Sequence, residues 1–205
     1  GSRSGGGRGA GSGSASADDD APRGTDLIIR YLQGGYEELL GSVDEFAFNK
    51  PGTHLAYTVD AADNNGNGVY LIDLRTGARR GLDNEKAEYA RLTWDEAGTS
   101  LAVLKGTTPE GFEERANTLL GFQRVVAPAD GAAITSINQF AYDGSDDDAF
   151  PDGFVISERG SLAWSVGAGK LFFGIKEQTA EPEETDDPIA DVNIFHWNDE
   201  RIQTV

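Results

Sequence analysis

The stretch FAFNKPGTHLAYTVDAADNNGNGVYLIDL, residues 46–74, contains a pattern that recurs twice further along the chain. An aromatic residue, Phe48, is followed by the turn sequence Asn-Lys-Pro-Gly and then by a short apolar run that begins at Leu55. The same order of aromatic, turn and apolar run starts again at Trp94 and at Trp164, with a leucine seven residues after each aromatic. Repeats of this length, built from short strands, are typical of the blades of a β-propeller.

The spacing of the repeats predicts the architecture. The first two aromatics lie 46 residues apart and the next two 70 apart, so the last interval contains an insertion. A hairpin over residues 27–43, with a Gln-Gly-Gly turn, also repeats: a shift of 42 residues lays its first strand on the run from Val69, and further copies include Leu119 and Val192. We therefore predict an all-β fold, a partial β-propeller of about three and a half four-stranded antiparallel blades in an open arc.

The composition along the chain separates two regions. Residues 1–17 contain only Gly, Ser, Ala and Arg, so we expect residues 1–23 to be a disordered linker or loop. The partial propeller is expected over residues 24–205, with blades at about residues 24–43, 44–90, 91–140 and 154–205. Because an open arc leaves its end blades without neighbours, those blades should expose apolar side chains.

The chain is strongly acidic, with a formal net charge of -18. This charge argues against a nucleic-acid partner, because phosphate binding requires clusters of Lys and Arg. No apolar run approaches the roughly 18 residues of a membrane-spanning helix, so no membrane span is expected. The chain lacks Cys, which excludes disulfides and Cys-based metal sites. It also lacks Met, even at position 1, and we interpret it as a fragment or a processed piece.

Two insertions in the repeat concentrate negative charge. Residues 141–153 and residues 181–187 are the two segments, and the first contains five aspartates: Asp143, Asp146, Asp147, Asp148 and Asp152. Charge blocks of this kind usually form solvated loops. The alternative is an acid-lined rim that selects cationic ligands.

The sequence DAADNNGNG, which begins at Asp60, is similar to the first half of a calcium-binding loop. It places Asp63, Asn65 and Asn67 at alternate positions, but the closing carboxylate that such a loop needs at its twelfth position is replaced by Leu74. A hairpin turn rich in Asn and Gly explains the same residues. We therefore predict a turn with no metal site.

No pattern typical of a catalytic or cofactor site occurs in the chain. His54 and His196 occupy repeat positions that accept very different side chains, so neither is expected to be catalytic. The Gly-x-Ser-x-Gly nucleophile motif and the phosphate-binding loop signature are absent. Trp94, Trp164 and Trp197 could form a carbohydrate platform, but their fixed place in the repeat favours the blade core. We predict no catalytic, cofactor-binding or metal-binding residue in this chain.

Four stretches of the chain resemble the N-terminal propeller of large bacterial proteins of the prolyl oligopeptidase family: FAFNKPGTHLAYTVDAADNNGNGVYLIDLRTG, LTWDEAGTSLAVLKG, LAWSVGAGKLFFGIKEQ and DVNIFHWNDERIQTV. The resemblance covers about residues 24–205. In this family a propeller precedes an α/β-hydrolase domain. The resemblance therefore implies a serine peptidase or hydrolase whose catalytic triad lies C-terminal to this chain.

The resemblance also implies a role for the chain itself. A propeller of this family covers the active site and admits substrates by size, so the chain would be a non-catalytic segment that gates or selects peptide substrates. Its partners would be the C-terminal hydrolase domain and the remaining blades, and the family suggests a periplasmic or extracellular location. The alternative is a freestanding TolB-like propeller that acts as a protein-interaction scaffold. A downstream Gly-x-Ser-x-Gly motif would favour the peptidase, and an early stop codon the scaffold.

Overall fold

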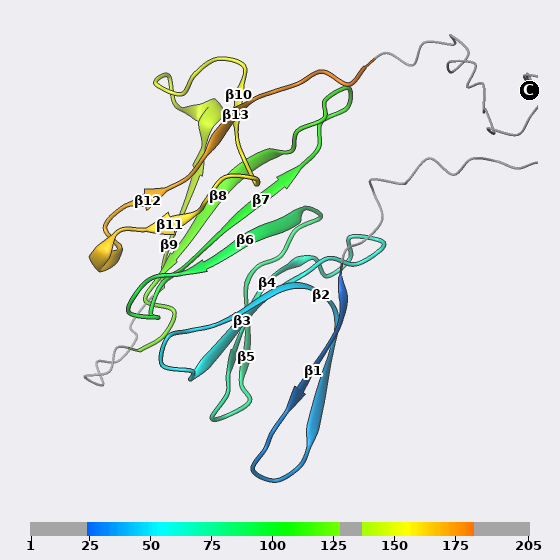
Figure 1. Ribbon diagram of the computed structural model, residues 1–205, viewed down its shortest axis with the longest axis vertical. Coiled ribbons are helices and arrows are strands. Elements are labelled where there is room, and N and C mark those ends of the chain that lie inside the picture. The colour runs from blue at the N-terminus through cyan, green and yellow to red at the C-terminus, as the bar shows by residue number, and fades with distance from the viewer. Residues whose placement is uncertain (1–23, 128–136, 183–205) are drawn as a thin grey trace, which may run out of the picture.

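The computed structural model describes residues 24–127 and 137–182 of the chain (Figure 1). The predicted disordered segment 1–23 and most of the second acidic insertion lie outside the described residues. No helix within the described ranges is long and apolar enough to cross a membrane. The elements in chain order are β1 (Thr25–Arg30), β2 (Glu37–Phe48), β3 (His54–Val59), β4 (Gly68–Asp73), β5 (Arg79–Asp83), β6 (Glu88–Trp94), β7 (Leu101–Thr107), β8 (Ala116–Gln123), β9 (Asn138–Asp143), the 3-10 helix η1 (Gly144–Asp146), β10 (Phe154–Ile156), β11 (Ala163–Trp164), the 3-10 helix η2 (Val166–Ala168), β12 (Leu171–Phe172) and β13 (Ile175–Glu177).

The strands pair in chain order, as in the blades of a propeller. One antiparallel sheet has the order β1-β2-β3-β4-β5 and a second has the order β6-β7-β8-β9. The pairs β10–β13 and β11–β12 are two parts of one hairpin, interrupted where Gly160 and Gly174 lie against each other. The all-β class and the open, partial propeller that the repeat predicts are confirmed.

Strand β2 belongs to two units of the repeat, so the predicted boundary at residues 43–44 falls inside one continuous strand. Its first part pairs with β1, where Val43 lies opposite Thr25, and its second part pairs with β3, where Phe46 lies opposite Tyr57. The pairing with β3 shifts register between Val43 and Phe46, and Ser42 has a φ of 54°. The bulge turns β2 sharply (Figure 1), because an extra residue in one strand bends it.

This bend defines four units, which we call blades. Half-blade 1 is β1 with residues 37–43 of β2, blade 2 is the rest of β2 with β3, β4 and β5, blade 3 is β6 to β9, and blade 4 is β10 to β13. Leu27, Ile29 and Leu40 of half-blade 1 pack against Leu55 and Ile72 of blade 2. Half-blade 1 therefore stacks on the face of the next sheet, although hydrogen bonds connect the two.

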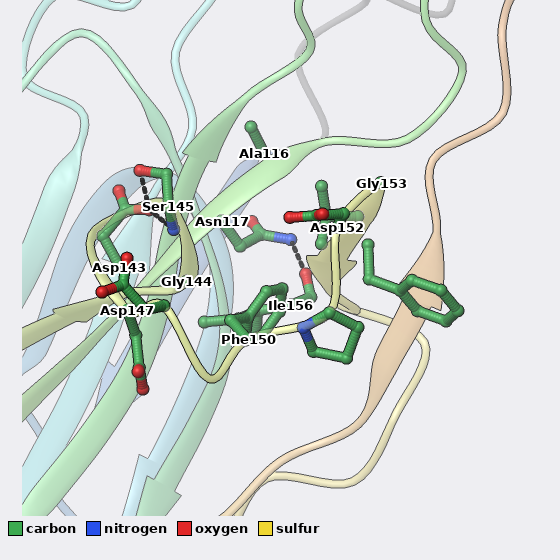
Figure 2. A pocket seen from close by; sticks show the side chains of 14 residues that line it. Ala116, Asn117, Asp143, Gly144, Ser145, Asp147, Phe150, Asp152, Gly153 and Ile156 are labelled. Atoms are coloured by element: carbon green, nitrogen blue, oxygen red, sulfur yellow. Dashed lines mark hydrogen bonds between the residues drawn. The ribbon is translucent and has the colours of Figure 1, made fainter.

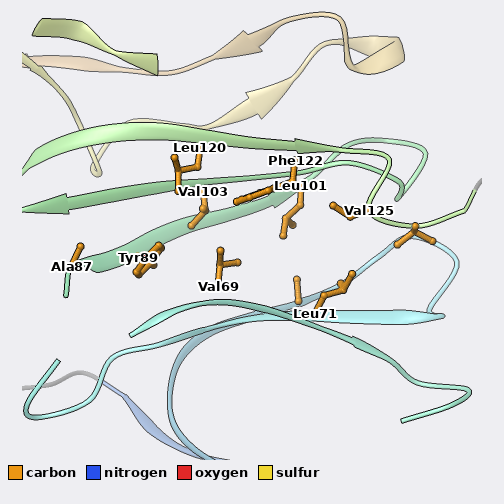
Figure 3. Packing of buried hydrophobic residues seen from close by; sticks show 11 residues of the cluster. Val69, Leu71, Ala87, Tyr89, Leu101, Val103, Leu120, Phe122 and Val125 are labelled. Carbon is orange, nitrogen blue, oxygen red and sulfur yellow. The ribbon is translucent and has the colours of Figure 1, made fainter. Parts of the chain in front are cut away.

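Blades 2 and 3 are apolar on both faces, because each has a neighbour on both sides. In β7, Leu101 and Val103 belong to the cluster between blades 2 and 3 that Figure 3 shows, whereas Ala102 and Leu104 belong to the cluster between blades 3 and 4. All four side chains are at most 2% exposed. Burial on both faces explains why the sequence Leu-Ala-Val-Leu shows no alternation of apolar and polar residues.

The repeat aromatics connect neighbouring blades through their indole nitrogens. Trp94 Nε1 donates a hydrogen bond to the carbonyl oxygen of Ala47 at 3.0 Å, and Trp164 Nε1 donates one to the carbonyl oxygen of Thr93 at 3.3 Å. Ala47 and Thr93 each precede the aromatic of their own blade, so the contact is the same at two successive seams. Phe48 holds this position in blade 2 and is 54% exposed, because no described inner strand of half-blade 1 covers it.

The two ends of the arc expose apolar side chains, as the reading of an open arc predicts. Ile28 and Leu39 face outward from half-blade 1 and are 59% and 61% exposed. At the other end, Phe172 of blade 4 is 59% exposed. Within residues 24–127 and 137–182, no further sheet packs on either of these faces.

One predicted loop is partly a strand. The polar insertion was expected to start at residue 141, but β9 runs to Asp143 and pairs with β8 over its whole length. The reason is packing, since the Tyr142 ring lies 5.6 Å from the Phe173 ring of blade 4 and extends the apolar seam. The insertion therefore leaves the sheet at η1.

Two glycines in equivalent repeat turns, Gly98 and Gly52, differ in how closely the seam between blades 2 and 3 packs against them. Gly98 has a φ of 70°, and a Cβ atom there would lie 2.8 Å from Pro51 Cδ and 2.9 Å from the Lys50 nitrogen. Gly52 has the equivalent place in blade 2 and a φ of 68°, with no atom within 4 Å of its Cβ position. We expect Gly52→Ala to lower the free energy of unfolding by ~1–2 kcal/mol through backbone strain alone, and Gly98→Ala to lower it further. Urea unfolding measures both, and equal losses would contradict close packing at this seam.

Candidate functional site

An acidic cavity of about 470 Å³ opens between blades 3 and 4 (Figure 2). The first acidic insertion forms most of its wall, and the start of β8 and strand β10 form the rest. The lining residues that carry the argument are Asn117, Asp143, Asp147, Asp148, Phe150 and Asp152. We call this hollow the acidic cavity.

Two of its carboxylates hold the insertion in shape. Asp143 accepts hydrogen bonds from the backbone nitrogen and the hydroxyl of Ser145, at 3.0 and 2.8 Å, and so caps η1. Asp147 accepts from the Ala149 nitrogen at 2.9 Å and from the Tyr142 hydroxyl at 2.8 Å. The backbone amides of Ser145 and Ala149, the largest cause in each case, hold the pKa of Asp143 and of Asp147 below the ordinary value. Both carboxylates are therefore charged at neutral pH.

The other two carboxylates are available to a ligand. Asp148 and Asp152 line the same cavity, and the described part of the chain supplies no hydrogen bond or ion pair to either side chain. Phe150 lines the cavity as well, with its ring over Gly144. Carboxylates and an apolar ring in one cavity fit a long cationic side chain, since Lys and Arg lay their methylene stems on apolar surface and direct the charge outward.

Asn117 fixes the floor of the cavity to the next blade. Its Nδ2 donates to the carbonyl oxygen of Ile156 at 2.8 Å, which Figure 2 shows as a dashed line. Asn67 makes the same contact one blade earlier, donating to the carbonyl oxygen of Ala87 at 3.0 Å. The side-chain oxygen of Asn117 points toward Gly106 on β7, not into the cavity. Both asparagines are buried and serve the stacking of the blades.

The turn that is similar to a calcium-binding loop is held by its own hydrogen bonds. Asp63 accepts from the backbone nitrogen of Asn65 at 3.0 Å and from its Nδ2 at 2.6 Å. Asn67, besides its bond to Ala87, donates to Asp60 Oδ1 at 3.3 Å. The described residues bring together no group of three His, Cys, Asp or Glu side chains suited to a metal ion. The absence of a metal site stays a prediction, and calorimetry with Ca²⁺ tests it.

The structure separates the other residues that the sequence singled out. His54 lies at the start of β3, with Nδ1 3.0 Å from Thr53 Oγ1 and far along the chain from the acidic cavity. Trp94 and Trp164 are half-buried in successive seams and bonded to backbone, as a core position requires. His196 and Trp197 lie outside the described residues.

A cluster of ions in the seam between blades 3 and 4 was not singled out from the sequence. The Arg115 side chain is 7% exposed and pairs with Glu88 of β6 and, at 2.6 Å, with Glu158 of blade 4. Lys176 pairs with Glu114 nearby. We call Arg115, Glu88 and Glu158 the seam ion cluster. It joins blades and offers no nucleophile or proton-transfer pair.

Comparison with known proteins finds weak similarity of fold. No protein family matches the chain, and no curated protein matches it. The acylaminoacyl peptidase of Pyrococcus horikoshii is similar over 58% of this chain and 21% of its own, with 12% identity and a TM-score of 0.39. The β-propeller domain of the Trilobed protease from Pyrococcus furiosus, which has an open velcro topology, is similar over 78% of this chain and 49% of its own, with 12% identity and a TM-score of 0.40. This chain thus spans about a fifth and about half of the two structures.

Proposed function

We propose that the chain is the non-catalytic propeller segment of a prolyl oligopeptidase-like serine hydrolase. In this role it gates or selects peptide substrates for an α/β-hydrolase domain C-terminal to it. Three of the four stretches that resemble the family span strands of consecutive blades, β2–β4, β6–β7 and β11–β13, and the fourth lies outside the described residues. The acidic cavity is the observation that carries the selecting role, because it offers carboxylates without partners on the loop end of the blade stack.

The carboxylates of the acidic cavity determine which charge on a peptide is favoured. Four aspartates line one cavity; Asp143 and Asp147 hold the loop, and Asp148 and Asp152 are left to pair with a ligand. A peptide with Lys or Arg gains an ion pair there, whereas an acidic peptide meets repulsion from the cavity and from the net charge of -18. We therefore propose that basic peptides are preferred.

The experiment uses the longer protein that contains this chain. Two peptides with the same cleavage site are compared, one with Lys and one with norleucine at a single flanking position. The double variant Asp148→Asn/Asp152→Asn is expected to raise KM for the Lys peptide about threefold to tenfold at unchanged kcat, since each exposed ion pair contributes ~0.2–1 kcal/mol. Asp146→Asn is the matched control, because Asp146 lies in the same insertion but does not line the cavity.

Two results would contradict the proposal. Equal KM changes for the Lys and norleucine peptides would contradict the proposal that the acidic cavity selects substrates. Absence of any peptide or ester hydrolysis by the longer protein would contradict the proposal that it is a hydrolase. In the second case, a freestanding scaffold of the TolB-like kind would be favoured.

A further inference from the structure

A second cavity, of about 510 Å³, opens in the seam between blades 2 and 3. It lies at the opposite end of the sheets from the acidic cavity, because it is bordered by the residues that follow β8, whereas the acidic cavity is bordered by the first residues of that strand. We call it the arginine cavity. Its lining includes Leu71, Val125 and Val126, which are buried and apolar, and His54, Arg75, Arg79 and Arg80.

The lining of this cavity is positively charged, in contrast to the acidic composition of the whole chain. The chain has 35 acidic and only 17 basic residues, yet three arginines and one aspartate line this hollow. The aspartate, Asp73, is occupied by the turn that follows β4. Its Oδ1 accepts hydrogen bonds from the backbone nitrogens of Arg75 at 2.9 Å and Thr76 at 3.3 Å. Asp73 keeps its negative charge, but among the described residues it forms no ion pair with any of the three guanidinium groups, and positive charge prevails in the cavity by three groups to one.

The three arginines differ in what holds them. Arg79 lies opposite Ile72 and pairs with Glu38 of half-blade 1, so its charge is matched on the far face of blade 2. Arg80 lies opposite Leu71, which packs in the seam with blade 3, and neighbours across a sheet share a face. Arg80 therefore stands on the seam side. Among the described residues, neither Arg80 nor Arg75 has a carboxylate partner for its guanidinium.

His54 adds a neutral donor to the wall. Burial, the larger cause, lowers the pKa of His54 in spite of the nearby Asp73, so the ring is neutral at neutral pH. Thr53 Oγ1 already accepts a hydrogen bond from Asn49 Nδ2 at 3.1 Å and lies 3.0 Å from His54 Nδ1. The hydroxyl lies closer to Nδ1 than to Asn49 Oδ1, at 3.0 against 3.5 Å, and in the tautomer in which it donates to Nδ1 the other ring nitrogen, Nε2, carries a proton and is a donor.

We propose that the arginine cavity binds a carboxylate carried on an apolar body, such as the C-terminal residue of a peptide. Guanidinium groups match the planar geometry of a carboxylate with two parallel hydrogen bonds. The buried wall of Leu71, Val125 and Val126 receives an aliphatic side chain beside it. A free phosphate uses the cations but gains nothing from this wall. This proposal does not depend on the selecting role of the acidic cavity. All the residues that line the arginine cavity in the structure come from this chain.

The test uses the 205-residue chain and two probes that differ in one charge. Binding of N-acetyl-leucine and of N-acetyl-leucinamide is measured by calorimetry and by saturation-transfer NMR. N-acetyl-leucine is expected to bind at least tenfold more tightly than the amide. Arg80→Gln and Arg75→Gln are each expected to weaken its binding about tenfold, because a hydrogen bond to a charged group is lost.

Arg30→Gln is the matched control. It removes the same charge from an exposed pair with Glu37 on the hairpin of half-blade 1 and is expected to leave binding unchanged. Equal affinity for the acid and the amide would overturn the proposal. The same holds if Arg80→Gln binds as the unchanged chain does, or if inorganic phosphate displaces N-acetyl-leucine at equal concentration.

Discussion

Replacement of Arg115 by Met is expected to lower the free energy of unfolding by about 3 kcal/mol. The guanidinium is 7% exposed and is shared by Glu88 and Glu158, so its removal leaves two carboxylates facing each other in the seam between blades 3 and 4. Breaking a buried pair from one side costs ~3–5 kcal/mol, and the lower end applies because the two glutamate side chains stay 31% and 28% exposed. Urea unfolding followed by tryptophan fluorescence measures the loss.

Two further variants separate charge from packing at this seam. Arg30→Met removes an exposed pair, with side chains 67% and 49% exposed, and is expected to cost no more than ~1 kcal/mol. The triple variant Arg115→Met/Glu88→Gln/Glu158→Gln should recover most of the loss, because uncharged groups then fill the seam. A loss for Arg115→Met no larger than that for Arg30→Met would show that the seam ion cluster does not hold the blades together.

Replacement of Trp94 by Ala is expected to lower the free energy of unfolding by about 3–5 kcal/mol. The indole packs on the cluster between blades 2 and 3 and donates a hydrogen bond to Ala47, so its loss leaves a cavity and an unpaired carbonyl. Phe48→Ala is the matched control, since Phe48 has the same place in the repeat but is 54% exposed. Its loss is expected to be about 1 kcal/mol, in proportion to the smaller area buried.

Trp94→Phe distinguishes the hydrogen bond from the packing. It keeps most of the ring volume and removes the indole N–H, so a loss of ~0.5–1.5 kcal/mol is expected. Thermal and urea unfolding of the three variants give the ranking. If Trp94→Ala retains full stability, the ring is not part of the seam, and the alignment of the three aromatics has no structural meaning.

The blade architecture could be predicted from the sequence because each repeat encodes it locally. The turn after Phe48 or Trp94, followed by an apolar run, specifies a hairpin without reference to the rest of the chain. The structure buries the same apolar runs on both faces, as stacked sheets require. The acidic insertion could be recognised by composition, although the extent of β9 within it depends on the contact of Tyr142 with Phe173.

The cavities and the seam ion cluster could not be predicted in this way. Arg80 and Val125 line one cavity but come from different blades. Arg115, just before β8, meets Glu88 of β6 on the far side of β7 and Glu158 across a seam. Such contacts depend on how one blade is rotated against the next, which the repeat pattern does not specify. The continuity of β2 was missed for a related reason, since a bulge between Val43 and Phe46 joins two units that the alignment treats as separate.

The recurrence of the Trp94 and Trp164 bonds makes the described blades a linear array with nearest-neighbour coupling. Blade 3 shares a buried cluster with each of two neighbours, whereas half-blade 1 shares a single cluster with blade 2. Local opening therefore starts at β1 and at blade 4 and proceeds inward, and the amide protons of β7 and β8 exchange last with solvent. Among the described residues, resistance to local opening is thus graded along the chain and is highest in its middle blades.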